Sequence, residues 1–160
     1  MLKAVRKTED ALKYASEELK NDKEFMLEVV LQAEKTKILK EIKETDSYNA
    51  IVNASEELKN DKEVVINAVK RDGYALQYVS KELQNDKEVV LKAVKQNGYV
   101  LKEVSEELKN DKEVVLEAVK QNGNALKFAS EELKNDKEIV LEAVKQCYYA
   151  IQYASEELKK

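Results

Sequence analysis

The chain has 160 residues, 38% charged and 43% hydrophobic, with three glycines and neither histidine nor proline. Its net charge of −4 comes from 28 basic and 32 acidic residues mixed along the whole length, so the sequence lacks the basic block that nucleic-acid binding requires. The missing histidine removes the usual general base, metal ligand and pH switch, and the missing proline favours helix throughout.

The first clear pattern is the string Ser-Glu-Glu-Leu-Lys-Asn-Asp-Lys-Glu, which begins at Ser16. Similar strings return at Ser55, Ser80, Ser105 and Ser130, and a shortened one at Ser155. From Ser55 onward the spacing is 25 residues, whereas between Ser16 and Ser55 it is 39, or one period plus 14. A fixed period of this length predicts a repeat array. We therefore expect a single repeat domain over residues 1–160, with about five to six units and a 14-residue insertion around 32–46.

The insertion lengthens the second apolar segment of the first repeat. At 3.6 residues per turn, 14 residues make nearly four turns, so they rotate the helix face by only about 40°. No glycine or proline interrupts the stretch. We predict one extended helix over residues 22–44, with Ile42 near the side that carries Val29; a break near Thr36 into two helices is the alternative. A projecting helix of this kind would act as a docking or dimer arm, or would only pad one end.

Each 25-residue unit carries two apolar clusters with helical spacing. The first cluster, in one copy, consists of Ala75, Leu76, Val79 and Leu83. The second consists of Val89, Val90, Leu91, Ala93 and Val94. Both clusters place their apolar residues on one side of a helix, and the alternation typical of strands is absent. The pattern predicts a hairpin in which a second helix over 86–96 is followed by the first helix of the next unit over 99–108.

Polar residues mark the ends of these helices. Asn85 and Glu88 have the spacing of a capping box, in which the asparagine begins the helix. Asp86 follows close to the positive end of the helix dipole. Gly98 comes directly after the second helix, where a left-handed glycine would end it.

Helices of about three turns are not stable alone, so the units must stack to bury their apolar stripes. We expect an all-α fold, an α-solenoid of stacked short hairpins similar to HEAT or armadillo superhelices. Both ends of the chain stop partway through a unit. The end faces would then be covered by another molecule, or the chain would be a piece of a longer array.

One copy of the unit reads Ala-Leu-x-Tyr-Ala-Ser-Glu-Glu-Leu-Lys-Asn-Asp-Lys-Glu-Val-Val-Leu-Glu-Ala-Val-Lys-Gln-Asn-Gly. This unit closely resembles the repeat family catalogued as domain of unknown function 4116, and the resemblance covers nearly the whole chain apart from the insertion. It implies a helical repeat found in tandem, with no established activity to carry over. The departures are Tyr48 and Tyr148 at the glycine position, and Cys147 at the preceding asparagine position.

No residue pattern predicts catalysis. A serine that recurs in every unit, without a partner base, indicates a structural hydroxyl that bonds the preceding turn. The Asn-Asp pairs lack the alternate oxygen ligands of a calcium loop. Cys147 is the only cysteine, so disulfide, zinc and Cys-His chemistry are not expected. We expect no enzyme, no cofactor, and no catalytic, cofactor-binding or metal-binding residue. The Lys-Glu surface is interpreted as a solvated face with helix-spaced ion pairs.

Three tyrosines are the candidate partner-binding residues. Tyr74, Tyr99 and Tyr149 occupy one repeat position at the start of the first helix, where exposure is expected. Tyrosine offers contact area at low entropic cost and is enriched at interfaces. Such a ladder would grip an extended peptide or a partner helix.

The most favoured function is a binding or scaffold protein for protein–protein interaction, with a protein or peptide partner of unknown identity. One alternative is a structural, self-assembling element that forms homo-oligomers through its uncapped ends or its long helix. A nucleic-acid-binding repeat is less favoured because of the acidic balance. Neither a signal peptide nor a membrane span is expected, and the lone cysteine fits a reducing compartment, so the expected location is cytoplasmic.

Overall fold

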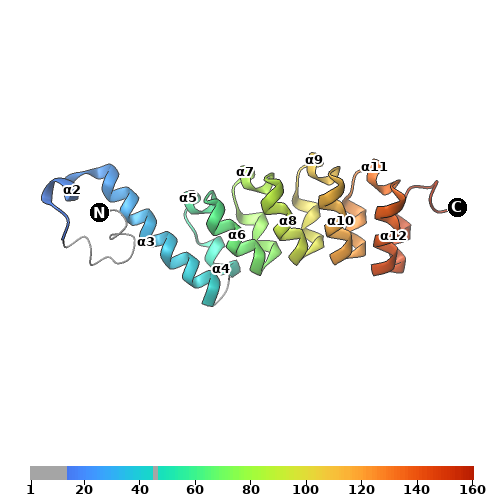
Figure 1. Ribbon diagram of the computed structural model, residues 1–160, viewed down its shortest axis with the longest axis horizontal. Coiled ribbons are helices and arrows are strands. Elements are labelled where there is room, and N and C mark those ends of the chain that lie inside the picture. Colours follow the sequence, from blue (N-terminus) through green and yellow to red (C-terminus); the bar gives the residue numbers. More distant parts are fainter. Residues whose placement is uncertain (1–13, 45–46) are drawn as a thin grey trace.

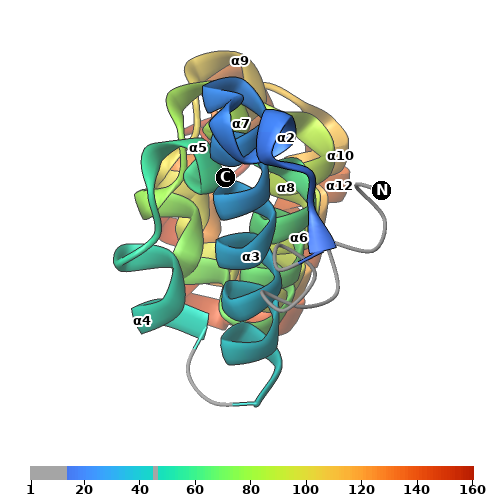
Figure 2. The ribbon, with the colours of Figure 1, turned by 90° about the vertical axis from the view of Figure 1, so that its left-hand side faces the viewer.

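The computed structural model describes residues 14–44 and 47–160, and every secondary-structure element in these ranges is helical. The helices stack side by side into a rod, with α2 (Glu17–Asn21) at one end and α12 (Lys137–Gln146) at the other (Figure 1). Viewed from the end that carries α2, the repeats lie one behind another (Figure 2). The predicted all-α solenoid is therefore confirmed.

A repeat contains three helical elements rather than two. In one copy these are the 3-10 helix η3 (Gly98–Glu103), the short helix α9 (Glu106–Lys109) and the longer helix α10 (Lys112–Gln121). The remaining copies contain α5 (Glu56–Lys59), α6 (Lys62–Arg71), η2 (Gly73–Tyr78), α7 (Lys81–Gln84), α8 (Lys87–Gln96), η4 (Gly123–Phe128), α11 (Glu131–Lys134), α12 and η5 (Tyr148–Tyr153).

The prediction of one continuous first helix over 99–108 is wrong. The backbone is extended at Val104 and Ser105, with ψ angles of 166° and 157°, so the helix is interrupted there. The Ser105 hydroxyl accepts a hydrogen bond from the backbone N–H of Leu108 at 3.4 Å and begins a new helix. A serine in the extended region is a favoured N-cap. The recurring serines are therefore structural, as expected, but they cap the helix that follows them.

The predicted capping box is also wrong, because aspartate and not asparagine caps the second helix. Asp86 Oδ1 accepts the N–H groups of Glu88 and Val89 at 2.9 and 3.2 Å. Asn85 instead ends the preceding helix α7, where its N–H bonds the carbonyl of Glu82. With no residue between the two helices, the Asn-Asp pair serves one end of each. The same arrangement recurs at Asp61, Asp111 and Asp136.

The glycines do not adopt the left-handed conformation that we predicted, since no described glycine has a positive φ. They are required by close packing between repeats instead. A Cβ at Gly98 would lie 2.2 Å from the carbonyl oxygen of Ala118 in the next repeat. At Gly73 and Gly123 the corresponding distances are 2.6 and 2.3 Å. The glycine position therefore sets how closely the repeats stack.

The core runs along the whole stack of second helices, α6, α8, α10 and α12. In α8 the apolar stripe consists of Val89, Val90, Ala93 and Val94, all fully buried. Neighbouring repeats cover this stripe from both sides, since α8 packs against α6, α10, η2 and η3. Full burial of a valine contributes about 1.5–3 kcal/mol. Each repeat therefore depends on its neighbours for most of its stability.

The extended helix is confirmed as a single element, α3 (Lys23–Glu44), without a break at Thr36. Its apolar face, however, does not stay on one side. The buried residues Val29 and Ile42 lie 42 − 29 = 13 residues apart, which places them about 140° apart around the helix. The prediction that they share a side is wrong.

The reason is the register of α3 against the repeat that follows. Lys35 pairs with Asp61 in the same way that Lys62 pairs with Asp86, so Lys35 and not Lys37 occupies this repeat position. The last turns of α3 therefore act as a second helix for the stack and pack against α4 (Ser47–Val52) and α6. The first turns pack against α2 and extend beyond the stack (Figure 1). The expected partial repeat at the start of the chain lies outside the described residues.

Candidate functional site

The three candidate tyrosines lie at the same place in successive repeats. Tyr74 and Tyr99 are the second residues of η2 and η3, and Tyr149 is the second residue of η5. Their exposed fractions are 43%, 36% and 74%, respectively. The expected exposure is therefore confirmed, and the stack brings the three residues onto one repeated position along the rod.

Short polar side chains fix the backbone of this position. The Tyr74 N–H donates to Asp72 Oδ1, and the Tyr99 N–H donates to Asn97 Oδ1, both at 2.9 Å. The cysteine at the equivalent position before Tyr149 makes no such cap. Two of the three tyrosines are therefore held at the start of a capped helical turn.

Aromatic contacts continue from this position to the next repeat. The ring of Tyr99 meets the ring of Phe128 edge-on, with centroids 5.0 Å apart. Tyr48 and Tyr78 make the same contact at 5.1 Å, and their hydroxyl oxygens are 2.6 Å apart. That hydrogen bond raises the pKa of Tyr78. We refer to the tyrosines 48, 74, 78, 99 and 149 with Phe128 as the tyrosine edge.

The tyrosine edge differs in chemistry from repeat to repeat. At the position of Tyr78 and Phe128, the intervening repeat carries Glu103, whose carboxylate accepts from Lys102 Nζ at 3.0 Å. This hydrogen bond is the main cause that raises the pKa of Lys102, with smaller contributions from Tyr74 and Tyr99. The edge thus places a cation and a carboxylate between two aromatic contacts, on a frame that is otherwise repetitive.

A ladder of ion pairs links each repeat to the next, and our reading of the surface missed it. In each step a lysine Nζ lies 2.7–2.9 Å from two carboxylates of the following unit. The steps are Lys35 to Asp61 and Glu63, Lys62 to Asp86 and Glu88, Lys87 to Asp111 and Glu113, and Lys112 to Asp136 and Glu138. The recurring Asp-Lys-Glu string was the available signal.

The ladder fixes the stacking register more than it adds stability, because exposed ion pairs contribute only about 0–1 kcal/mol each. Hydrogen bonds to Asp136 and Glu138 raise the pKa of Lys112 to about 12. Lys112 in turn lowers the pKa of Asp136, which also caps its helix. Each aspartate of the ladder therefore joins two repeats and begins a helix at the same time.

The capping serines supply a second connection between repeats. Ser155 Oγ donates to Asn135 Oδ1 at 2.5 Å, and its backbone N–H donates to the Lys134 carbonyl. Ser80 and Ser130 make the same pair of bonds to the repeats before them. At Ser55 the insertion has moved the preceding short helix away, and the buried Ser55 hydroxyl has no partner. The row of short helices is interrupted between α2 and α5.

The comparison with protein families matches this arrangement. The family model described as Domain of unknown function (DUF4116) matches five overlapping segments, residues 1–45, 37–84, 63–109, 86–133 and 111–159. The chain belongs to the DUF4116 family. No curated protein and no solved structure matches it. Each matched segment from 37 onward spans nearly two DUF4116 units, in keeping with the dependence of each unit on its neighbours.

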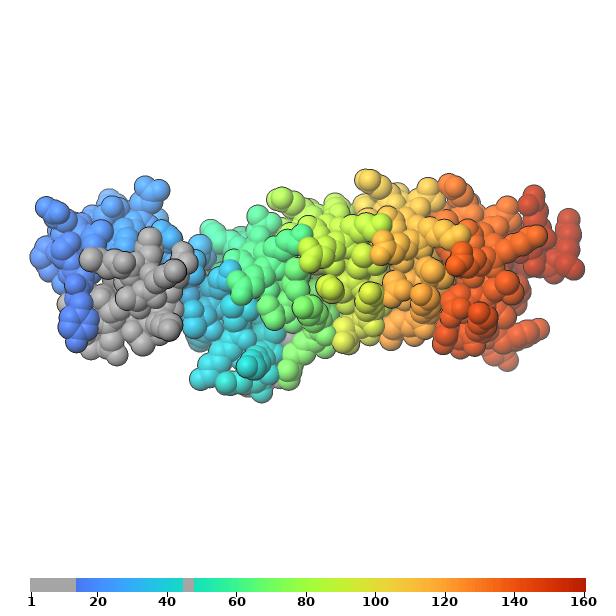
Figure 3. Space-filling view, in the orientation of Figure 1, coloured from blue at the N-terminus to red at the C-terminus, as the bar shows by residue number. Residues whose placement is uncertain are grey.

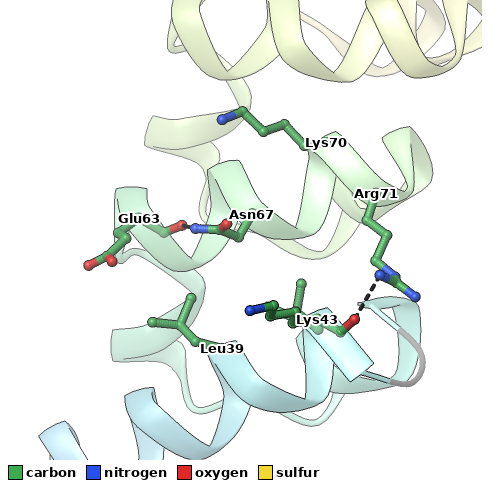
Figure 4. A pocket seen from close by; sticks show the side chains of 7 residues that line it. Leu39, Lys43, Glu63, Asn67, Lys70 and Arg71 are labelled. Carbon is green, nitrogen blue, oxygen red and sulfur yellow. Dashed lines mark hydrogen bonds between the residues drawn. The ribbon is translucent and has the colours of Figure 1, made fainter.

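An open hollow of about 450 Å³ lies where α3 meets the first regular DUF4116 unit (Figure 4). Arg71 donates to the carbonyl oxygen of Lys43 at 2.8 Å and so satisfies the C-terminal end of α3. In a regular unit the equivalent residue is Gln121, which instead accepts the N–H of Gly98 at 2.7 Å. The hollow therefore marks the altered junction that the insertion and Tyr48 require.

Within residues 14–44 and 47–160, no group of three or more acidic, cysteine or histidine side chains is arranged to hold a metal ion. Cys147 is half-buried, and its thiol faces Asn124 Oδ1 at 3.7 Å. None of the helices in these ranges combines the length and apolar character that a membrane crossing needs. The tyrosine edge is therefore the best candidate site of this DUF4116 chain.

Proposed function

We propose that this chain is a non-catalytic scaffold that binds a protein or peptide along the tyrosine edge. The observation that carries the proposal is the exposure of Tyr74, Tyr99 and Tyr149 in a stack that buries its other repeated apolar positions. Aromatic rings dominate the binding energy of many interfaces because they bury much area with few rotatable bonds.

The variation along the edge also supports this function. A purely structural position would repeat its chemistry as the capping aspartates do. Here Tyr99 is paired with Phe128, whereas Tyr74 lies near Lys102 and Glu103. A partner that lies across several repeats would meet a different set of groups at each step, and this is a basis for specificity. The basic groups of the ladder are paired with carboxylates, so they are poorly suited to contact phosphates.

The test compares capture of proteins from the native host by three forms of the chain. The first is the wild type, and the second carries Tyr74→Ala, Tyr99→Ala and Tyr149→Ala. The third is a matched control with three exposed glutamates of the short helices replaced by alanine, namely Glu57, Glu82 and Glu107.

A protein retained by the wild type and the control should bind the tyrosine variant about 100-fold more weakly, since three aromatic contacts are worth at least about 1 kcal/mol each. Circular dichroism must show that the tyrosine variant remains folded, because Tyr99 also packs against Phe128. Equal affinity for all three forms would remove the tyrosine edge from consideration.

A further inference from the structure

Three large aliphatic side chains are exposed in the described part of the chain. Leu27 and Val30, on the first turns of α3, are 71% and 50% exposed, and Leu141 on α12 is 61% exposed. Leu91 and Leu116, at the repeat position of Leu141, are only partly exposed because another repeat covers them. The two helices lie at opposite ends of the rod (Figures 1 and 3).

The exposed face of α12 has both an apolar and a charged part. It surrounds a hollow of about 240 Å³. The residues that line the hollow are Lys137, Val140, Leu141, Val144, Ile151 and Leu158. Lys137 occupies the ladder position of Lys112, but no carboxylate of the described residues pairs with it. This face offers an apolar surface beside an unpaired cation.

A further repeat with the regular spacing does not fit on this face. At the glycine position the next repeat brings a carbonyl oxygen within 2.2–2.6 Å of where a Cβ would be. This position holds Tyr148, whose Cβ and ring would occupy the same space. The complement of the α12 face therefore has to approach in another way.

The exposed face of α3 has matching chemistry. Leu27, Val30 and Glu34 are spaced by three and then four residues, so they lie along one stripe of the helix. Glu34 is exposed, and none of the ion pairs of the described residues involves it. We refer to these three residues as the α3 patch, and to Lys137, Leu141 and Val144 as the α12 patch.

The two patches match when the helices run antiparallel. From Val144 back to Leu141 is three residues, and from Leu141 back to Lys137 is four. Antiparallel packing therefore pairs Val144 with Leu27, Leu141 with Val30, and Lys137 with Glu34. Apolar groups meet apolar groups, and the unpaired cation meets the unpaired carboxylate.

From this match we infer that the chain associates head to tail with a second copy, the α12 patch of one molecule against the α3 patch of the next. The two patches are different surfaces at opposite ends, so the contact is heterologous and leaves one patch free at each end of the assembly. The result is an open linear assembly of rods. The inference does not depend on the tyrosine edge.

Sedimentation equilibrium tests the inference on the whole chain at concentrations up to about 1 mM, because patches of this size give weak contacts. The average mass of the wild type should rise with concentration from 18.3 kDa to beyond twice that value. Leu27→Asp and Leu141→Asp should each keep the protein monomeric. An equimolar mixture of the two variants should form dimers and nothing larger, because each variant retains one intact patch.

A charge exchange tests the register. Lys137→Glu and Glu34→Lys should each weaken association about tenfold, and the double variant should restore it, whereas Glu82→Lys on an exposed short helix should have no effect. A wild type that stays at 18.3 kDa at every concentration would overturn the inference. So would variants at Leu27 or Leu141 that associate like the wild type, or a mixture that remains monomeric. Both leucines are exposed, so the variants should fold, and circular dichroism checks this.

Discussion

Replacing Gly98 with alanine should push two repeats apart. The added Cβ would lie 2.2 Å from the Ala118 carbonyl oxygen, and Cβ contacts below 3.0 Å are essentially never seen. The gap must therefore widen by at least 3.0 − 2.2 = 0.8 Å. The obstacle is backbone in the middle of α10, so no side chain can rotate out of the way. The same movement would strain the hydrogen bond between the Gly98 N–H and Gln121.

Two opposing effects set the magnitude. Overpacking of a close contact costs about 1–3 kcal/mol. Alanine also restricts the unfolded chain and so favours folding by about 0.4–1 kcal/mol, with no conformational penalty here because the glycine φ is not positive. The net loss should be about 1–2 kcal/mol. For a chain of this length, such a loss lowers the melting temperature by about 2–8 °C.

Thermal and urea unfolding followed by circular dichroism would measure the effect. Gly73→Ala should cost less than Gly98→Ala, because its Cβ would lie 2.6 Å from the nearest carbonyl oxygen. Tyr148→Ala is the matched control, since Tyr148 stands at the same repeat position but is 74% exposed. If Gly98→Ala proved neutral or stabilising, the close approach of the repeats would be disproved as the reason for the glycine.

Two further substitutions test the connections between repeats. Ser130→Ala removes a helix cap and the hydrogen bond to Asn110, and should cost about 1–2 kcal/mol in urea unfolding. Ser55→Ala should be neutral or stabilising, because the Ser55 hydroxyl is buried without a partner; equal losses at both sites would contradict this account. The hydrogen bond from Lys62 lowers the pKa of Asp86 below 3.8 in the folded state. The stability that this carboxylate contributes is therefore full above pH 3.8 and is lost as the pH falls through the lowered value. Acid titration monitored by circular dichroism should show a shallower loss of stability for Lys62→Met, and an unchanged acid limb would argue against the ladder.

The architecture could be predicted because it depends on patterns within one repeat. The 25-residue spacing of the serines and the helical spacing of Val89, Val90, Ala93 and Val94 predicted stacked helices. The continuity of α3 followed from the absence of any glycine or proline between residues 22 and 44. These features need no knowledge of how close the next repeat comes.

The errors concern features that depend on two repeats at once. Gly98 looks like a helix terminator in isolation, and only the approach of Ala118 reveals its role. Whether Asn85 or Asp86 begins the helix depends on the tight connection between α7 and α8. The 14-residue insertion divides between α3 and the connection after it, so counting turns gave the wrong rotation.

The exposure of the candidate tyrosines was predictable from their position at the start of the first helices. The pairing of Tyr99 with Phe128 was not, because these residues lie 128 − 99 = 29 residues apart in sequence, somewhat more than one period. The identity of a partner has no counterpart in any repeat pattern, and it stays a question for the capture experiment.

Because each junction in the regular part of the rod uses much the same set of contacts, whole units are interchangeable in a way that parts of units are not. Deleting the 25 residues from Ser80 to Val104 would bring Val79 next to Ser105, the same pair of residue types that meet at each of those two boundaries. The rod would become shorter by one unit with its register unchanged. A deletion of any other length would displace the lysines from their carboxylates and the glycines from their carbonyls. Chains of this type can therefore gain or lose length by duplication and excision, one complete unit at a time.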